Sequence, residues 1–75
     1  MLAYNVVQEL EVNGAGNIAE GFIGVYVINI GGASGTFNGQ TLPAGTAKNF
    51  PFTGRPYNTT AYNATGTIFL ITVFK

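Results

Sequence analysis

Apolar and polar residues alternate along much of the chain with a period of two, which predicts strands and not helices. In residues 2–12 the even positions are mostly apolar, whereas Glu9 and Glu11 fall on the odd positions. This pattern is typical of a strand with one buried and one solvated face. Residues 21–30 and 67–75 are instead apolar at both even and odd positions. Both segments are therefore expected in central or interface positions, where the two faces of a strand are covered.

Turn-forming residues separate the predicted strands. Asn38 and Gly39 lie between two short runs in residues 36–42, and Asn-Gly in that setting is a strong signal for a tight hairpin. Pro43 and Gly45 then suit a turn of type II geometry. Residues 13–17 and 31–35 are rich in glycine, and we expect loops there.

The second half of the chain continues in the same way. Residues 46–52 form a predicted strand with Phe50 and Phe52 on one face, and Pro51 indicates an edge or a strand end because it has no amide donor. Residues 57–62 are a further short candidate strand. The whole pattern predicts a single all-β domain over residues 1–75, a small antiparallel β-sandwich or barrel of about 6–7 short strands.

The composition excludes most site chemistry. The 75 residues carry 8% charged side chains and no net charge, against about 25% charged residues in ordinary domains. The sequence has no Cys, His or Asp, so no disulfide framework, cofactor, metal centre or histidine-based acid–base catalysis is expected. Ser34 is the only serine and lies in a glycine-rich turn. Glu9 and Glu11 would lie roughly 6.6–6.8 Å apart along a strand, a spacing compatible with glycoside hydrolysis but more typical of a solvated face.

The small size favours self-association. Folding of a chain of this mass should bury apolar surface worth about 105 kcal/mol, against about 110 kcal/mol of ordering entropy, so the two terms nearly cancel. Without cysteine or metal ligands, oligomerisation is the remaining way to add stability. We therefore expect a homo-oligomer, a trimer or larger. The residues predicted to form its interface come from the two strands that are apolar on both faces: Phe22, Ile23, Val25, Val27, Phe69, Ile71 and Val73.

One polar segment is a candidate contact loop. Tyr, Asn and Arg side chains together make adaptable binding surfaces. A loop that binds a partner or a glycan and a polar turn with two core tyrosines are both compatible with the sequence. The residues concerned are Arg55, Tyr57, Asn58, Tyr62 and Asn63.

The central run of the chain carries a resemblance. Residues 27–46 read VINIGGASGTFNGQTLPAGT, in which a strand ends in a glycine-rich turn, a TFNG hairpin follows, and LPAGT makes the next turn. Together with the Tyr/Asn/Thr-rich segment and the apolar C-terminal strand, residues 22–75 resemble the small accessory structural proteins of bacteriophages, such as decoration, vertex, fibre-base or tail components. The resemblance implies a virion protein that is present in many copies and acts through shape and contact. It assigns no site residues.

These observations predict a non-enzymatic structural subunit of a phage particle that contacts its own copies and other virion proteins. A small lectin-like module that binds a carbohydrate or a receptor is the alternative. Three basic residues are too few for nucleic acid to be a partner. Residues 65–75 have the length of one strand of a membrane pore, but residues 21–30 and 67–75 lack the alternation of lumen-lining strands, so a membrane partner is not expected. We expect localisation in the virion after synthesis in the host cytoplasm, since the N-terminus does not read as a secretory signal.

Overall fold

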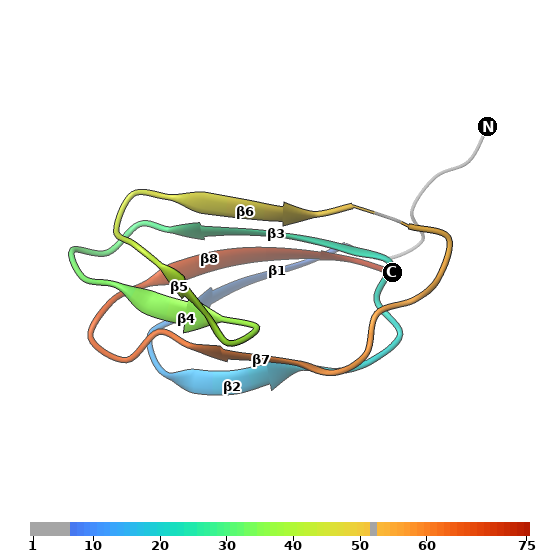
Figure 1. Ribbon diagram of the computed structural model, residues 1–75, viewed down its shortest axis with the longest axis horizontal. Coiled ribbons are helices and arrows are strands. Elements are labelled where there is room, and N and C mark those ends of the chain that lie inside the picture. The colour runs from blue at the N-terminus through green and yellow to red at the C-terminus, as the bar shows by residue number, and fades with distance from the viewer. Residues whose placement is uncertain (1–6, 52) are drawn as a thin grey trace.

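The computed structural model describes residues 7–51 and 53–75, and all of their regular structure is β (Figure 1). The eight strands are β1 (Val7–Val12), β2 (Ala15–Ile18), β3 (Gly24–Asn29), β4 (Gly35–Phe37), β5 (Gln40–Leu42), β6 (Ala47–Phe50), β7 (Thr60–Asn63) and β8 (Phe69–Phe74).

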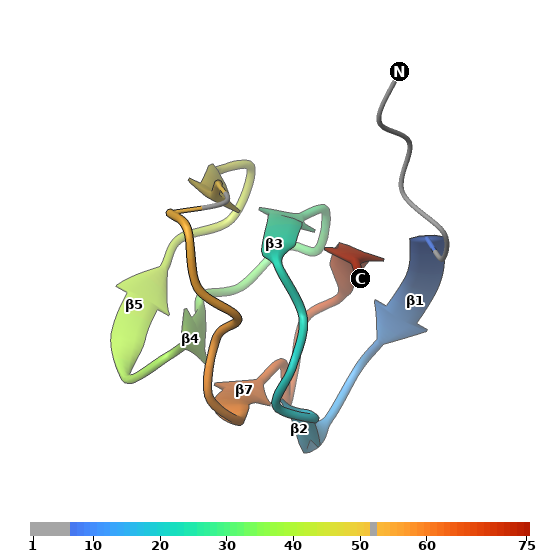
Figure 2. The same ribbon diagram turned by 90° about the vertical axis from the view of Figure 1, so that its right-hand side faces the viewer.

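The strands form two antiparallel sheets of four. The first sheet has the order β1-β8-β3-β6 and the second the order β2-β7-β4-β5. Viewed nearly along the strands, the two sheets form the two layers of a sandwich (Figure 2). The predicted all-β sandwich is thereby confirmed, with eight strands where about 6–7 were expected.

The pairing of the strands follows a simple rule. β1 pairs with β8, β2 with β7, β3 with β6 and β4 with β5, so the chain is one long antiparallel hairpin with its tip between β4 and β5. The hairpin is rolled up until β8 also pairs with β3 and β7 with β4. This is the strand order of a jelly roll, an architecture that occurs in viral capsid and lectin domains.

The tip of this hairpin has the predicted turn. Asn38 and Gly39 both adopt positive φ, 53° and 76°, as the two central residues of a type I′ turn must. Gly45 also has a positive φ of 78° at the third position of the next turn, where Thr46 N donates to the Pro43 carbonyl at 3.2 Å. The predicted hairpin turn is confirmed, and Gly45 has the positive φ that the predicted type II turn requires.

The predicted loop over residues 13–17 is wrong in part, because β2 begins at Ala15. This strand carries little side-chain signal and is held by its backbone ladder with β7. Gly16 fits there because Tyr62 of β7 crosses it closely: a Cβ on Gly16 would come within 2.5 Å of the Tyr62 hydroxyl. The strand therefore depends on a partner nearly fifty residues away.

The strand predicted over residues 46–52 is shorter in the structure, Ala47–Phe50, and the interpretation of Pro51 as a sign of an edge or a strand end is confirmed. β6 stops at Phe50 and lies at one edge of the first sheet as the described residues define it, where a missing amide donor costs least. The predicted placement of Phe52 and the first part of the strand predicted over residues 2–12 lie outside the described residues.

The core lies between the two sheets and takes alternate residues from each strand. Phe50 and Tyr57 close one end of it, since the Tyr57 ring stacks on Phe22 with centroids 5.1 Å apart. The buried core residues are Ile18, Phe22, Val25, Val27, Phe37, Leu42, Ala64, Phe69, Ile71 and Val73.

This placement corrects the predicted interface. Six of its seven residues lie in the core, each with at most 1% of its surface exposed, and the seventh, Ile23, is half-buried. They contact the opposite sheet of the same chain, because the sandwich closes over that side of β3 and β8. The uncovered side of these strands is the opposite one.

A fully buried asparagine joins the loops at one end of the sandwich. The Asn29 amide nitrogen donates to the Leu42 carbonyl at 2.9 Å and the Ala33 carbonyl at 2.8 Å. Its amide oxygen accepts from the Thr67 hydroxyl at 2.7 Å and from Gly31 N at 3.0 Å. The β3–β4 and β7–β8 connections and the end of β5 are thus held to the end of β3.

Candidate functional site

The outer side of the first sheet is apolar. Successive side chains of a strand point to opposite faces, so the residues that alternate with the core residues of β3 and β8 lie on this side. We call this surface the apolar outer face; its residues are Tyr26, Ile28, Ile30, Ile68, Leu70 and Phe74.

The strand register brings these side chains together. Tyr26 stands opposite Thr72 and Ile28 opposite Leu70, while Ile30 N donates to the Ile68 carbonyl at 2.9 Å and extends the ladder by one pair. Phe74 is half-buried and stands opposite Gly24 in the ladder between β3 and β8. The result is a continuous apolar band along the two central strands.

This band holds every large hydrophobic side chain that is exposed in the part of the chain that the structure describes. Tyr26 is 41% exposed, Ile30 48%, Ile68 37% and Leu70 39%. Isolated exposed hydrophobic residues are common on soluble proteins, but a contiguous patch of them marks an interaction surface. The clustering, and not the exposure of any one residue, is the informative feature.

The outer side of the second sheet is different. Its outward-facing side chains are small or polar, among them Asn17, Thr36, Thr41 and Asn63. A groove of about 250 Å³ on this side is lined by Ser34, Gly35, Thr36, Thr41, Asn63 and Thr65. The sandwich is therefore one-sided, with one outer face suited to water and one suited to a dry contact.

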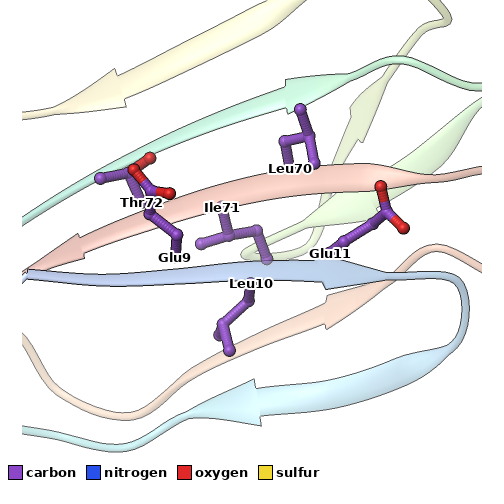
Figure 3. A pocket seen from close by; sticks show the side chains of 6 residues that line it. All are labelled: Glu9, Leu10, Glu11, Leu70, Ile71 and Thr72. Atoms are coloured by element: carbon purple, nitrogen blue, oxygen red, sulfur yellow. The ribbon is translucent and has the colours of Figure 1, made fainter.

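Carboxylates lie along one margin of the apolar outer face. Glu9 and Glu11 of β1 are exposed and stand opposite Thr72 and Leu70 of β8. The two glutamates, Leu70 and Thr72 point to the same side and flank a groove of about 340 Å³, whose floor includes Leu10 and Ile71 (Figure 3). Each glutamate thus lies next to a residue of the central strands and can accept a hydrogen bond from whatever covers the face.

The sequence analysis predicted that both faces of β3 and β8 are apolar. It assigned the predicted interface to the residues that the structure places on the inner face. One signal could have pointed to the outer set. Tyr26 and Thr72 face each other across β3 and β8 and both carry a hydroxyl group. The inward residues of the same strands, apart from Asn29, are purely hydrocarbon. Hydroxyl groups on one side of a strand indicate the side nearer to water.

The candidate contact loop is divided between the core and the surface. Tyr57 is half-buried on Phe22, and its hydroxyl donates to the Pro51 carbonyl at 2.6 Å. Tyr62 is also half-buried and packs against the core from β7. The polar-turn interpretation therefore describes both tyrosines. The three remaining members, Arg55, Asn58 and Asn63, are exposed.

Of these three, Asn63 has a defined local role. Its side-chain oxygen accepts a hydrogen bond from Thr65 N at 2.9 Å and so shapes the turn after β7. Asn63 also lines the polar groove of the second sheet. Asn63 is therefore the member of the candidate loop that both shapes a turn and lines this groove.

Comparison of the chain with protein-family models, with curated proteins and with solved structures finds no match. Within residues 7–51 and 53–75, no three side chains of the metal-binding types come together. Nor does that part of the chain contain a helix of the length and hydropathy needed to cross a membrane. Function is therefore inferred from the geometry of the two outer faces.

Proposed function

We propose that this protein is a non-enzymatic structural subunit that associates through the apolar outer face into an assembly of several copies. The observation that carries the proposal is the gathering of Tyr26, Ile30, Ile68 and Leu70 on one side of one sheet. Covering these side chains removes apolar surface from water, which is the main driving force of protein association. With three acidic and three basic residues, the chain has few charges to keep such a face soluble.

The assembly we propose is a phage particle, in which the protein would be a decoration, vertex, fibre-base or tail component. The support is the resemblance of residues 22–75 to such proteins, together with a strand order that capsid domains also use. A fold by itself hosts many functions, so the apolar outer face remains the stronger support. Mass spectrometry of purified particles from the source of this chain would detect it at a fixed stoichiometry; its absence from them would refute the virion assignment.

Light scattering over a range of protein concentrations tests the association itself. We expect a trimer or larger species, and a shift towards monomer when Leu70 and Ile30 are both replaced by threonine. Threonine keeps the β-propensity while removing apolar contact surface. Thr36→Glu, on the outer side of the second sheet, is the control and should leave the mass unchanged. A wild-type protein that stays monomeric at every concentration would exclude this function.

The polar groove of the second sheet favours a second candidate function, a lectin-like module. Hydroxyl and amide groups from Ser34, Thr36, Thr41, Asn63 and Thr65 converge there and could hydrogen-bond sugar hydroxyls. A glycan array should then show binding that Thr36→Val abolishes. Arg55→Ala, in the candidate contact loop but not among the groove residues, is the matched control. Absence of binding to any glycan would count against this candidate.

A further inference from the structure

We propose that the apolar outer face is covered by the same face of a second copy, related by a twofold axis that runs along β8. This inference rests on the proposed function and specifies the partner and the geometry of its contact. It follows from the order in which donors, acceptors and apolar side chains cross the sheet.

The outward side chains of the first sheet form rows in register across its four strands. One row contains Glu9 of β1, Thr72 of β8, Tyr26 of β3 and Asn49 of β6. The next row contains Glu11, Leu70, Ile28 and Ala47. Each row therefore begins with a carboxylate at the β1 edge and ends with an uncharged residue at the β6 edge.

Two sheets that pack face to face with their strands aligned can be related by a twofold axis in two ways. With the axis across the strands, β1 lies on β1 of the second copy and brings the glutamates of the two copies towards each other. Like charges placed together at an interface are unfavourable. With the axis along the strands, each row lies over the same row of the second copy, but the two rows run in opposite directions across the sheet. The two β1 strands, which carry the glutamates, are then kept apart.

In the arrangement we propose, the axis runs along β8. β1 of each copy then lies over β3 of the other, so that Glu9 stands opposite Tyr26 of the second copy, and the same pair forms twice. Isologous contacts are doubled in this way by symmetry. The Tyr26 hydroxyl would donate to the Glu9 carboxylate, while Thr72 and Leu70 meet their own copies on the axis.

The geometry of packed sheets permits the pairing. Stacked sheets lie about 10 Å apart, a gap that a tyrosine and a glutamate reach across together. Aligned sheets cross at about 30°, and a strand about 4.8 Å from the axis is displaced by only about 2.5 Å at that angle. The register of the rows therefore survives near the axis, where the Glu9–Tyr26 pair would form.

The area of the proposed contact is small, so the association through it should be weak. The axis along β8 brings three strands of each copy into contact, because β6 lies beyond the second copy. Three strands at about 4.8 Å spacing and six residues at about 3.3 Å give a contact of roughly 300 Å² per copy. Stable dimers bury about 800 Å² per partner. The pairing is therefore weak for two isolated copies. A trimer or larger assembly needs further contacts elsewhere on the subunit.

Cross-linking of single-cysteine variants tests the axis, and the native chain has no cysteine to interfere. Thr72→Cys lies on the proposed axis and should give a covalent dimer with a short bis-maleimide reagent. Asn49→Cys, on the same outer side but on the edge strand β6, should not cross-link. In the proposed pairing this strand lies beyond the edge of the second copy. Thr36→Cys, on the other sheet, is the second negative control.

The outcomes separate this inference from the proposed function. A wild-type protein that is always monomeric overturns both. Association without cross-linking of Thr72→Cys, or with efficient cross-linking of Asn49→Cys, overturns the twofold pairing and leaves the proposed function standing.

Substitution of the paired side chains gives an independent readout. Tyr26→Phe should weaken association about a hundredfold or more, since the pair forms twice and each lost hydrogen bond to a charged group typically costs about tenfold. Tyr62→Phe is the matched control and should have no effect, because Tyr62 packs against the core. Glu11→Gln should strengthen association, since Glu11 would lie opposite Ile28 of the second copy. Equal effects of the two tyrosine variants would contradict the pairing.

Discussion

The buried Asn29 offers the sharpest test of how this small sandwich is held together. Asn29→Ala removes four side-chain hydrogen bonds of 2.7–3.0 Å at a site with no solvent exposure. The Leu42 carbonyl and the Thr67 hydroxyl make buried bonds to Asn29, and these groups would lose them. A buried polar group without a partner costs about 1–3 kcal/mol, and a more accessible lost bond about 0.5–1.5 kcal/mol.

Summed over the four groups, the loss should be about 3–9 kcal/mol. A chain of 75 residues has a total stability of only about 4–11 kcal/mol, at roughly 0.05–0.15 kcal/mol per residue. The substitution should therefore lower the melting temperature by at least about 12 °C, since 1 kcal/mol corresponds to about 4–8 °C in a domain of this size. A change of this size would make Asn29 one of the most important residues for stability.

Urea unfolding followed by far-UV circular dichroism measures the change. The midpoint should fall while the slope of the transition stays the same, as expected when stability changes and compactness does not. Asn17→Ala, an exposed asparagine in β2, is the control and should cost less than about 0.5 kcal/mol. If Asn29→Ala does not fold, Thr67→Val removes only the hydroxyl donor and should cost about 1–3 kcal/mol.

A loss below about 1 kcal/mol for Asn29→Ala would refute the reasoning. It would mean that water or a small backbone shift replaces the lost bonds. A double-mutant cycle between Asn29→Ala and Thr67→Val gives a further check, because residues that share a hydrogen bond should couple by more than about 0.5 kcal/mol. Strict additivity would show that the 2.7 Å contact contributes nothing to stability.

Three other substitutions have defined outcomes. Gly35→Ala should destabilise the fold by about 1–3 kcal/mol in thermal unfolding, because its Cβ would lie 2.5 Å from the Phe69 ring; an unchanged melting temperature would contradict this packing. Gly39→Ala should cost about 1–2 kcal/mol in urea unfolding, since φ at this position is 76°, and an effect no larger than that of an exposed strand substitution would argue against the turn. Tyr57→Ala should cost about 2–4 kcal/mol through the lost stacking on Phe22, whereas Tyr57→Phe should cost less than about 1 kcal/mol; the reverse order would mean that the hydroxyl, and not the ring, matters.

The one-sided sandwich explains why the low charge and the apolar strands occur together. A jelly roll buries one side of each sheet, so β3 and β8 need only one apolar side to fold. The apolar side chains on their other side add nothing to the core between the sheets. An exposed apolar sheet face carries a risk of aggregation, and the assembly that we propose would cover it.

The sequence by itself determined the class of structure and several local features. The period of two excluded helices, Asn38 and Gly39 set the hairpin turn, and Pro51 ended β6. It also indicated that β3 and β8 would be apolar on both sides. These features depend on neighbouring residues and on backbone preferences, which a single sequence displays directly.

The tertiary structure alone decided which side of β3 and β8 became the core. A period of two gives the two sides of a strand but does not say which one the second sheet will cover. Here the sheet of β2, β7, β4 and β5 covers the side of Val25, Val27, Phe69, Ile71 and Val73. The sequence also did not predict β2 or the role of Asn29, because both depend on distant residues. β2 pairs with β7, and Asn29 bonds to Thr67, 38 positions away. Contacts between distant segments set these features, and no local pattern in the chain encodes them.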